Sequence, residues 1–196
     1  HDYKTIANDP EIGIVVETMG GVEPAYTFVK EMLEAGKQVA TSNKNLVAAK
    51  GAELIKIARD HNVNFQFEAS VGGGIPIIRP LNKCLTADEI EEITGILNGT
   101  TNYILTRMTQ SGLSYDEALK EATDLGYAEA DPTADVDGLD AGRKIAIMAS
   151  IAFHSRVTFS DVYIEGIRNI TAKDITTEYV DAQATKSALL SRKEAL

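Results

Sequence analysis

The order of elements is set by residues 12–41, IGIVVETMGGVEPAYTFVKEMLEAGKQVAT. Residues 12–17 form a short, continuous apolar run, which is typical of a strand buried in a parallel sheet. Residues 24–36 then carry apolar side chains at helical spacing, and residues 38–41 are again strand-like. A strand, a helix and a second strand in this order predict an α/β fold with a mostly parallel sheet and right-handed connections.

The alternation continues and then changes character. Residues 45–59 have a helical pattern, and residues 63–68 alternate apolar and polar side chains with a period of two. Residues 89–97 are ambiguous, because isoleucines recur there every third residue, but their β-branched character and short length favour a strand. The other predicted elements are helices at 75–85, 101–110, 114–126 and 140–153 and a strand at 162–167.

Composition narrows the class of protein. With 196 residues, of which 44% are hydrophobic, the chain is apolar enough to fold as one compact domain or two small lobes. A net charge of −10 opposes binding to nucleic acid and to anionic membrane surfaces, and no apolar run approaches the roughly 20 residues that cross a bilayer. Three scattered histidines and one cysteine, Cys84, provide neither a zinc cluster nor an internal disulfide, so a reducing, cytoplasmic setting is expected.

The stretch richest in carboxylates is residues 126–144, GYAEADPTADVDGLDAGRK. It matches part of a calcium-binding loop, but Lys144 stands where the closing glutamate is required, so the calcium interpretation fails. Two interpretations stay open. Asp137 could simply cap the next helix, with Asp140 in its first turn. Alternatively, Asp140 and Lys144, one turn apart on the same helix face, could belong to a substrate site rather than to a surface salt bridge.

A second lysine stands in an unfavourable place. In residues 41–45, TSNKN, a strand ends and Ser42 or Asn43 can cap the helix that follows. Lys44 then falls in the first helical turn, where the positive end of the helix dipole disfavours a cation. At the carboxyl end of a parallel sheet, its charge could meet an anion or polarise a carbonyl group, although lysines also occur in first turns without a function.

Three further stretches are candidate binding sites. Two of them can also be explained as ordinary turns or helix caps, and the third lacks the dinucleotide-binding motif. Residues 68–76, EASVGGGIP, most often form a simple turn, but Glu68 and backbone carbonyl groups freed by the glycines could also bind a hard cation. Residues 98–102, NGTTN, are a dense set of helix-capping residues, for which ordinary helix initiation is expected. Residues 19–22, MGGV, follow a strand without G-x-G-x-x-G spacing, so the dinucleotide fingerprint is missing and this chain alone is expected to bind dinucleotide weakly.

Five motifs, in order along the chain, resemble those of the homoserine dehydrogenases. They are VETMGG at 16–21, TSNK at 41–44, EASVGGGIP at 68–76, NGTTNYI at 98–104 and the whole of 126–144. The last, with its GYAEADP opening and D-x-x-x-K end, is the most specific, and the resemblance covers roughly residues 10–170. The family's N-terminal strand and glycine-rich turn are absent, and the polar tail does not resemble the family's closing helix.

The resemblance implies a role for each motif of the substrate site. Lys144 would be the proton donor and acceptor at the substrate oxygen. Asp140 and Glu129 would hold homoserine through its hydroxyl side and its amino group, and Lys44 would orient the substrate and the nicotinamide. These roles fit the chemistry, because oxidation of an alcohol needs a base for the hydroxyl proton and an amino-acid substrate needs carboxylates for its ammonium group.

The same resemblance implies a cofactor, NAD or NADP, and a monovalent cation, expected to be sodium. The cofactor would contact Thr41, Ser42, Lys44 and Gly126. The cation would bind the Glu68 carboxylate and the carbonyl groups of Val71, Gly73 and Ile75.

The resemblance finally implies a domain organisation and a reaction. Residues 1–66 would be the C-terminal part of a Rossmann-type domain, residues 67–180 a substrate and dimerisation domain with a mixed sheet covered by helices, and residues 181–196 a polar tail with no assigned role. The protein would be a cytoplasmic homodimer that interconverts homoserine and aspartate semialdehyde for threonine and methionine biosynthesis. The alternatives are a non-catalytic oligomerisation module and another semialdehyde-handling dehydrogenase of the same two-lobed plan.

Overall fold

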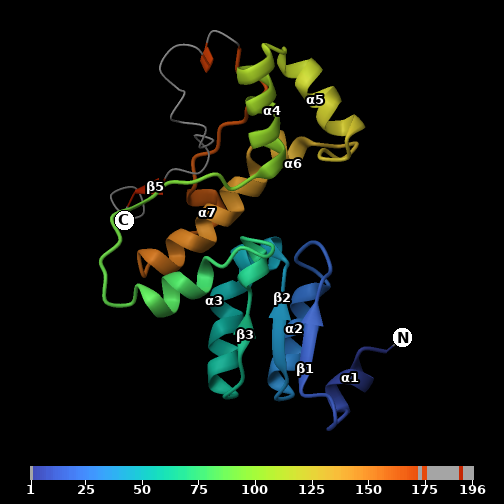
Figure 1. The fold of residues 1–196 in the computed structure, drawn as a ribbon. Helices are drawn as coiled ribbons and strands as arrows, with labels where there is room; N and C mark the ends of the chain where they lie inside the picture. Colours follow the sequence, from blue (N-terminus) through green and yellow to red (C-terminus); the bar gives the residue numbers. More distant parts are fainter. Residues whose placement is uncertain (1, 172–173, 176–189, 192–196) are drawn as a thin grey trace.

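The computed structural model describes residues 2–171, 174–175 and 190–191. These residues form two lobes, and helix α7 (Leu139–Ala152) lies between them (Figure 1). No helix in the described part of the chain is long and apolar enough to cross a membrane.

The first lobe is built on a parallel sheet with the strand order β1-β2-β3. Val15 lies opposite Val39, and Val39 lies opposite Phe65. The predicted order of strands and helices in this region is therefore confirmed. The elements are α1 (Lys4–Asn8), β1 (Ile14–Glu17), α2 (Ala25–Glu34), β2 (Gln38–Thr41), α3 (Lys44–Asp60) and β3 (Phe65–Gln66).

One face of the edge strand β1 is open within the described residues. Ile14 and Val16 are 68% and 67% exposed, whereas Glu17, which points to the opposite face, is 5% exposed. The core lies on the covered face, where Leu33 of α2 and Leu46 and Leu54 of α3 are fully buried. The carboxyl ends of β1 and β2 point toward α7 (Figure 1), so residues that follow these strands face the second lobe.

The second lobe is mainly helical, and two predicted helix starts are confirmed there. Ser114 and Glu117 form the predicted capping box of α5, and Asn98 caps α4 by accepting a hydrogen bond from the Thr101 amide. The elements are η1 (Glu68–Ser70), η2 (Pro80–Cys84), β4 (Glu92–Ile93), α4 (Gly99–Ser111), α5 (Tyr115–Asp124), α6 (Thr133–Val136), η3 (Phe159–Asp161) and β5 (Leu190–Ser191).

Several predicted elements of this lobe differ from the structure. The helix predicted at 75–85 is reduced to a short helical stretch at 78–84, which contains η2. Pro80 is tolerated there because it lies in the first turn, where a backbone N–H has no helical partner. The strand predicted at 89–97 is reduced to β4, which pairs antiparallel with β5. This pair is the only sheet of the second lobe within the described residues, so a larger mixed sheet is not seen there.

The strand predicted at 162–167 is wrong. Its isoleucines pack against helices instead of lying in a ladder: the Ile164 side chain lies so close to Gly142 of α7 that a Cβ atom added to Gly142 would be 2.7 Å from it. The Ile167 amide donates to the Val136 carbonyl oxygen at the end of α6, at 2.8 Å. The β-branched pattern therefore reflects burial against α6 and α7, which a short apolar run cannot distinguish from a strand.

The hydrophobic core links the two lobes through α7. Ile145 and Met148 of α7 belong to the same buried cluster as Leu33 and Leu46 of the first lobe. A second cluster, which includes Ile104, forms between α4, α5 and α6. Because α7 is fixed against the first lobe by this packing, charged residues in its first turns are held above the carboxyl end of the parallel sheet.

Candidate active site

The structure brings together three of the predicted site residues. Lys44, the first residue of α3, and Lys144 of α7 both pair with the carboxylate of Asp140. Lys44 Nζ contacts Asp140 Oδ1, and Lys144 Nζ lies 2.8 Å from Asp140 Oδ2. The Lys44 side chain is 37% exposed, the Lys144 side chain 14% and the Asp140 side chain 6%. This is therefore a largely buried ion triad and not a surface salt bridge.

The charges of the triad compensate one another. Burial alone would raise the pKa of Asp140, but hydrogen bonds from Asn98, Lys144 and Lys44 and the charge of Lys144 lower it below its ordinary value. Asp140 also lies in the first turn of α7, where the helix dipole favours a carboxylate. Asp140 offsets the unfavourable position of Lys44 at the start of α3, because its carboxylate contacts the Lys44 ammonium group.

Lys144 is held from two sides. Its ammonium group donates to the Leu97 carbonyl oxygen at 2.8 Å as well as pairing with Asp140. A lysine ammonium has three N–H donors. Within the described residues two of them are therefore used, and the third is free to meet an oxygen atom of a ligand.

Asn98 is a site residue that the sequence analysis assigned only to helix initiation. Its side-chain Nδ2 donates to Asp135 Oδ1 at 2.7 Å and to Asp140 Oδ2 at 3.0 Å. The capping residues clustered around Asn98 in the sequence predicted the cap of α4, and that cap is present. The contacts with α6 and α7 cross 37 and 42 residues of sequence, and no local pattern predicts them.

Asp131 and Asp137, two of the carboxylates between Glu129 and Asp140, have partners outside the triad and its Asn98 contact. Asp131 accepts a hydrogen bond from the Thr133 amide, and Asp137 pairs with Arg168. The prediction that Asp137 caps the following helix is wrong. Asp137 instead follows the last residue of α6, and α7 has Gly138 as its N-cap residue, with a φ of +78° and no side-chain cap.

Within the described residues, Glu129 and Gly126 make no hydrogen bond or ion pair with the ion triad. Glu129 is exposed and has no side-chain hydrogen bond or ion pair within the part of the chain that the structure describes. Gly126 has a φ of +77° just after α5, a conformation that favours glycine. The next carbonyl group, of Tyr127, accepts a hydrogen bond from the Thr100 hydroxyl at 2.9 Å, which ties this loop to the start of α4.

Near Lys44, at the end of β2, the Thr41 side chain is hydrogen-bonded and the Ser42 side chain is exposed. The Thr41 hydroxyl donates to Glu17, a buried carboxylate that the sequence analysis did not single out, and accepts from the Asn43 amide. Ser42 is exposed at the same edge. Parallel α/β proteins bind nucleotides beyond the carboxyl ends of such strands, so Ser42 and the backbone of Thr41 fit a cofactor contact.

Glu68 is held by backbone donors. Its carboxylate accepts hydrogen bonds from the amides of Ile77, Ile78 and Arg79, at 2.5, 2.7 and 2.8 Å. Burial would raise the pKa of Glu68, but these three donors lower it overall. No described residue donates a hydrogen bond to the carbonyl oxygens of Val71, Gly73 or Ile75, so these oxygens are available to water or to a ligand.

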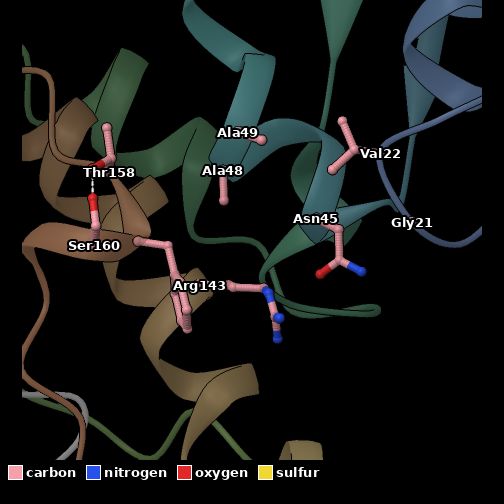
Figure 2. Close-up of a pocket in the computed structure, with 9 residues that line it drawn as sticks. Gly21, Val22, Asn45, Ala48, Ala49, Arg143, Thr158 and Ser160 are labelled. Atoms are coloured by element: carbon pink, nitrogen blue, oxygen red, sulfur yellow. Dashed lines mark hydrogen bonds between the residues drawn. The ribbon is translucent and has the colours of Figure 1, made fainter.

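A cavity of about 470 Å³ is lined by Asn45, the residue after Lys44 on α3, and by Arg143, the residue before Lys144 on α7 (Figure 2). It is bordered by the residues after Lys44 on α3, by the loop at Gly21 and Val22, and by η3. Arg143 points into it, with its guanidinium carbon 4.8 Å from the centre of the Phe159 ring. Consecutive helical residues project about 100° apart, which is why Arg143 faces this cavity while Lys144 faces Asp140.

The fold and the triad define an α/β protein with a cationic, carboxylate-braced site at the carboxyl end of a parallel sheet. The model of the family Homoserine dehydrogenase matches residues 76–192, and the model of Homoserine dehydrogenase, NAD binding domain, matches residues 1–68. The chain belongs to the homoserine dehydrogenase family.

Individual relatives agree with this assignment. The homoserine dehydrogenases of Synechocystis sp. and Corynebacterium glutamicum are 53% and 56% identical to this chain, over 89% and 84% of its length. The chain spans 40% and 37% of those relatives. The comparisons give no support to the oligomerisation module or to another semialdehyde-handling enzyme.

Solved structures show the same fold. A homoserine dehydrogenase from Thiobacillus denitrificans matches with a TM-score of 0.85 and 48% identity, over 89% of this chain and 40% of that one. A hyperthermophilic archaeal homoserine dehydrogenase in complex with NADPH matches with a TM-score of 0.78 and 31% identity, over 88% of this chain and 53% of that one.

Proposed function

We propose that this chain supplies the substrate and proton-transfer site of an NAD(P)-dependent homoserine dehydrogenase, which interconverts L-homoserine and L-aspartate 4-semialdehyde. The observation that supports this most directly is the pairing of Lys44 and Lys144 with the buried Asp140 at the carboxyl end of the parallel sheet. Family membership indicates the substrate, and the triad offers the charged groups that its chemistry requires.

Lys144 is the proposed acid and base. In the oxidation direction, its neutral amine takes the hydroxyl proton of homoserine while hydride leaves the same carbon. In the reduction direction, its ammonium group returns that proton to the aldehyde oxygen. The cofactor, NAD or NADP, accepts or supplies the hydride when bound. Lys44 orients the substrate from the opposite side of Asp140, and Glu129 is the proposed partner of the substrate ammonium.

Steady-state turnover tests the proposal. The full-length protein should oxidise homoserine with NAD or NADP, and it should be far less active with 4-hydroxybutyrate, which lacks the amino group. Glu129→Gln should reduce this difference in activity, because it should weaken the binding of homoserine but not that of 4-hydroxybutyrate. Absence of any homoserine-dependent formation of reduced nicotinamide, in a folded full-length protein, would contradict the proposed function.

We further propose that cofactor binding involves Thr41, Ser42, Lys44 and Gly126, and that residues 1–196 alone bind it weakly. The physical reason is that no G-x-G-x-x-G turn in this sequence presents helix-end amides to the pyrophosphate. Calorimetry with NADPH measures this affinity. Submicromolar binding by these residues alone would overturn the expectation.

A monovalent cation is the proposed ligand of Glu68 and the carbonyl groups of Val71, Gly73 and Ile75. One carboxylate with several carbonyl oxygens suits a hard ion of low charge, and no group of three or more metal-binding side chains occurs in the described residues. Crystals grown with rubidium in place of sodium should give an anomalous peak there. A water molecule with ordinary hydrogen-bond distances in its place would contradict the site.

The assembly and domain division are also proposals. We expect residues 1–66 to belong to the nucleotide-binding domain and residues 67–180 to a substrate domain that forms a homodimer in the cytoplasm. Ile96 and Tyr163, which are 53% and 78% exposed in that lobe, provide apolar surface for self-association. Sedimentation should show a dimer, and a monomer at every concentration would contradict this.

A further inference from the structure

We propose that Asn98 is a positioning residue, whose side-chain amide fixes the plane of the Asp140 carboxylate and thereby the positions of both lysines. The effect on turnover rests on the proposed function, whereas the effect on Asp140 itself does not. In this role, Asn98 makes no contact with a reacting atom. It acts through Asp140.

Both N–H donors and the oxygen of the Asn98 side chain have hydrogen-bond partners. It is 6% exposed, its Nδ2 donates to Asp135 and Asp140, and its Oδ1 accepts from the Thr101 amide at 2.8 Å. A flipped amide would point its oxygen at two carboxylates and its NH₂ group at a backbone N–H. The network therefore admits one orientation of this amide.

This amide links two carboxylates that would otherwise repel each other. Asp135 lies on α6 and Asp140 on α7, and a neutral group with two N–H donors lies between them. Each oxygen of Asp140 consequently has an assigned partner: Oδ1 meets Lys44, whereas Oδ2 meets Asn98 and Lys144. Loss of the amide would free the carboxylate to rotate about its Cβ–Cγ bond.

The residue before Asn98 contributes to the same arrangement. The Leu97 carbonyl oxygen accepts from Lys144 Nζ at 2.8 Å. One short segment, at the start of α4, thus contacts both the anion and the cation of the α7 pair. A displacement of this segment would move Lys144 and Asp140 together, and misplacement of a reacting group by about 1 Å can cost on the order of a hundredfold in rate.

The charged groups that face Asp140 come from three elements. They are Lys44 from α3, Lys144 from α7 itself and Asp135 from α6, the last across the Asn98 amide. Asn98 is the largest of the hydrogen-bonding contributions that lower the pKa of Asp140 against the effect of burial. Removal of its N–H donors should therefore raise that pKa.

The competing explanation is that Asn98 only caps α4. Asn98→Ser separates the two roles, because serine retains an oxygen that can accept from the Thr101 amide but has no N–H donors for the carboxylates. Asn98→Asp also retains the cap, and it places a third carboxylate between Asp135 and Asp140. Ser114→Ala is the matched control, because it removes the cap of α5 far from the triad.

The experiment measures kcat, KM for homoserine, the pH profile and the melting temperature in the full-length protein, together with the Asp140 pKa by carbon-13 NMR. Asn98→Ser should lower kcat by about ten- to a hundredfold with little change in KM and raise the Asp140 pKa. It should also melt at a lower temperature, because two carboxylates lose a buried hydrogen bond, but kcat measured well below that melting temperature should stay low. Asn98→Asp should lose more activity, and Ser114→Ala should lose only stability.

Two outcomes would overturn the inference. A normal kcat and an unchanged Asp140 pKa in Asn98→Ser would show that the amide positions nothing. Activity losses that merely follow the melting temperature, as in Ser114→Ala, would assign Asn98 to the cap alone. If the parent protein has no homoserine turnover, the proposed function fails, and the Asp140 pKa in the two Asn98 variants still decides the positioning role.

Discussion

Asp140 and Glu68 are both carboxylates whose pKa is lowered although burial would raise it, but different groups compensate them. Glu68 accepts from three successive backbone amides, the farthest 11 residues away in sequence. Asp140 is compensated by side chains from α3, α7 and the start of α4, and Lys44 is 96 residues away. One environment is local backbone, whereas the other requires the packed fold.

This difference separates a structural from a chemical use of a carboxylate. Backbone amides stay in place as long as their turn exists, so they hold a carboxylate but give or take no proton. Lysine side chains can exchange a carboxylate partner for a substrate oxygen, and an amine can carry a proton. The Asp140 environment is therefore suited to catalysis, and the Glu68 environment to holding a turn or an ion.

The largest expected effect concerns Lys144. Lys144→Ala should lower turnover in the full-length protein by about a hundred- to ten-thousandfold, the usual contribution of general acid–base catalysis. Lys144→Arg should not restore it, because arginine keeps a charge but effectively never deprotonates. Turnover is measured beside melting curves, with Lys120→Ala, an exposed lysine paired with Asp124 on α5, as the control. Near-normal turnover in Lys144→Arg would reduce the Lys144–Asp140 pair to a salt bridge.

The next effect is on stability and falls on Asp140. Asp140→Asn removes the anion that two lysines share, and loss of a buried, charge-assisted hydrogen bond should lower the free energy of unfolding by about 1.5–3 kcal/mol. Because the folded pKa is lowered, this contribution is full above the ordinary aspartate pKa of about 3.9 and is lost as pH falls through the folded pKa. Urea unfolding of both proteins across pH should show that the difference in their free energies of unfolding becomes smaller only at acid pH. A difference that becomes larger at acid pH would contradict this sign.

Sequence alone predicted the local parts of this site and not its long-range parts. The strand–helix–strand order, a cap at Ser42 or Asn43 and the Asp140–Lys144 pair depend on residues within a few positions of one another, and all are present, with Asn43 as the cap. The Asn98 contacts and the packing of 162–167 against α6 and α7 join residues distant in sequence. Asp137 was misassigned because α6 ends there, and the short α6 was not predicted.

The third prediction concerns Glu68. Glu68→Gln should lower the free energy of unfolding by about 1–2 kcal/mol, less than the change at Asp140, because the glutamine oxygen can still accept from some of the three amides. The lowered pKa gives this contribution the same sign, full above the ordinary glutamate pKa of about 4.3 and lost at lower pH. Turnover should fall only where the proposed cation is needed, so the test compares activity with and without sodium. A loss of activity as large as that of Lys144→Ala, at every sodium concentration, would contradict the contrast with Asp140.

The smallest effect is expected at Asp137, three residues before Asp140. Its side chain is 37% exposed and pairs with Arg168, whose side chain is 44% exposed, so solvent screens the pair. Such surface pairs contribute about 0–1 kcal/mol. Asp137→Asn should therefore shift the urea midpoint only slightly and leave kcat and KM for homoserine unchanged, although it removes the same charge from the same stretch as Asp140→Asn. If both variants lost turnover equally, turnover would depend on the net negative charge of the loop. It would not depend on the specific pairing of Asp140 with two lysines.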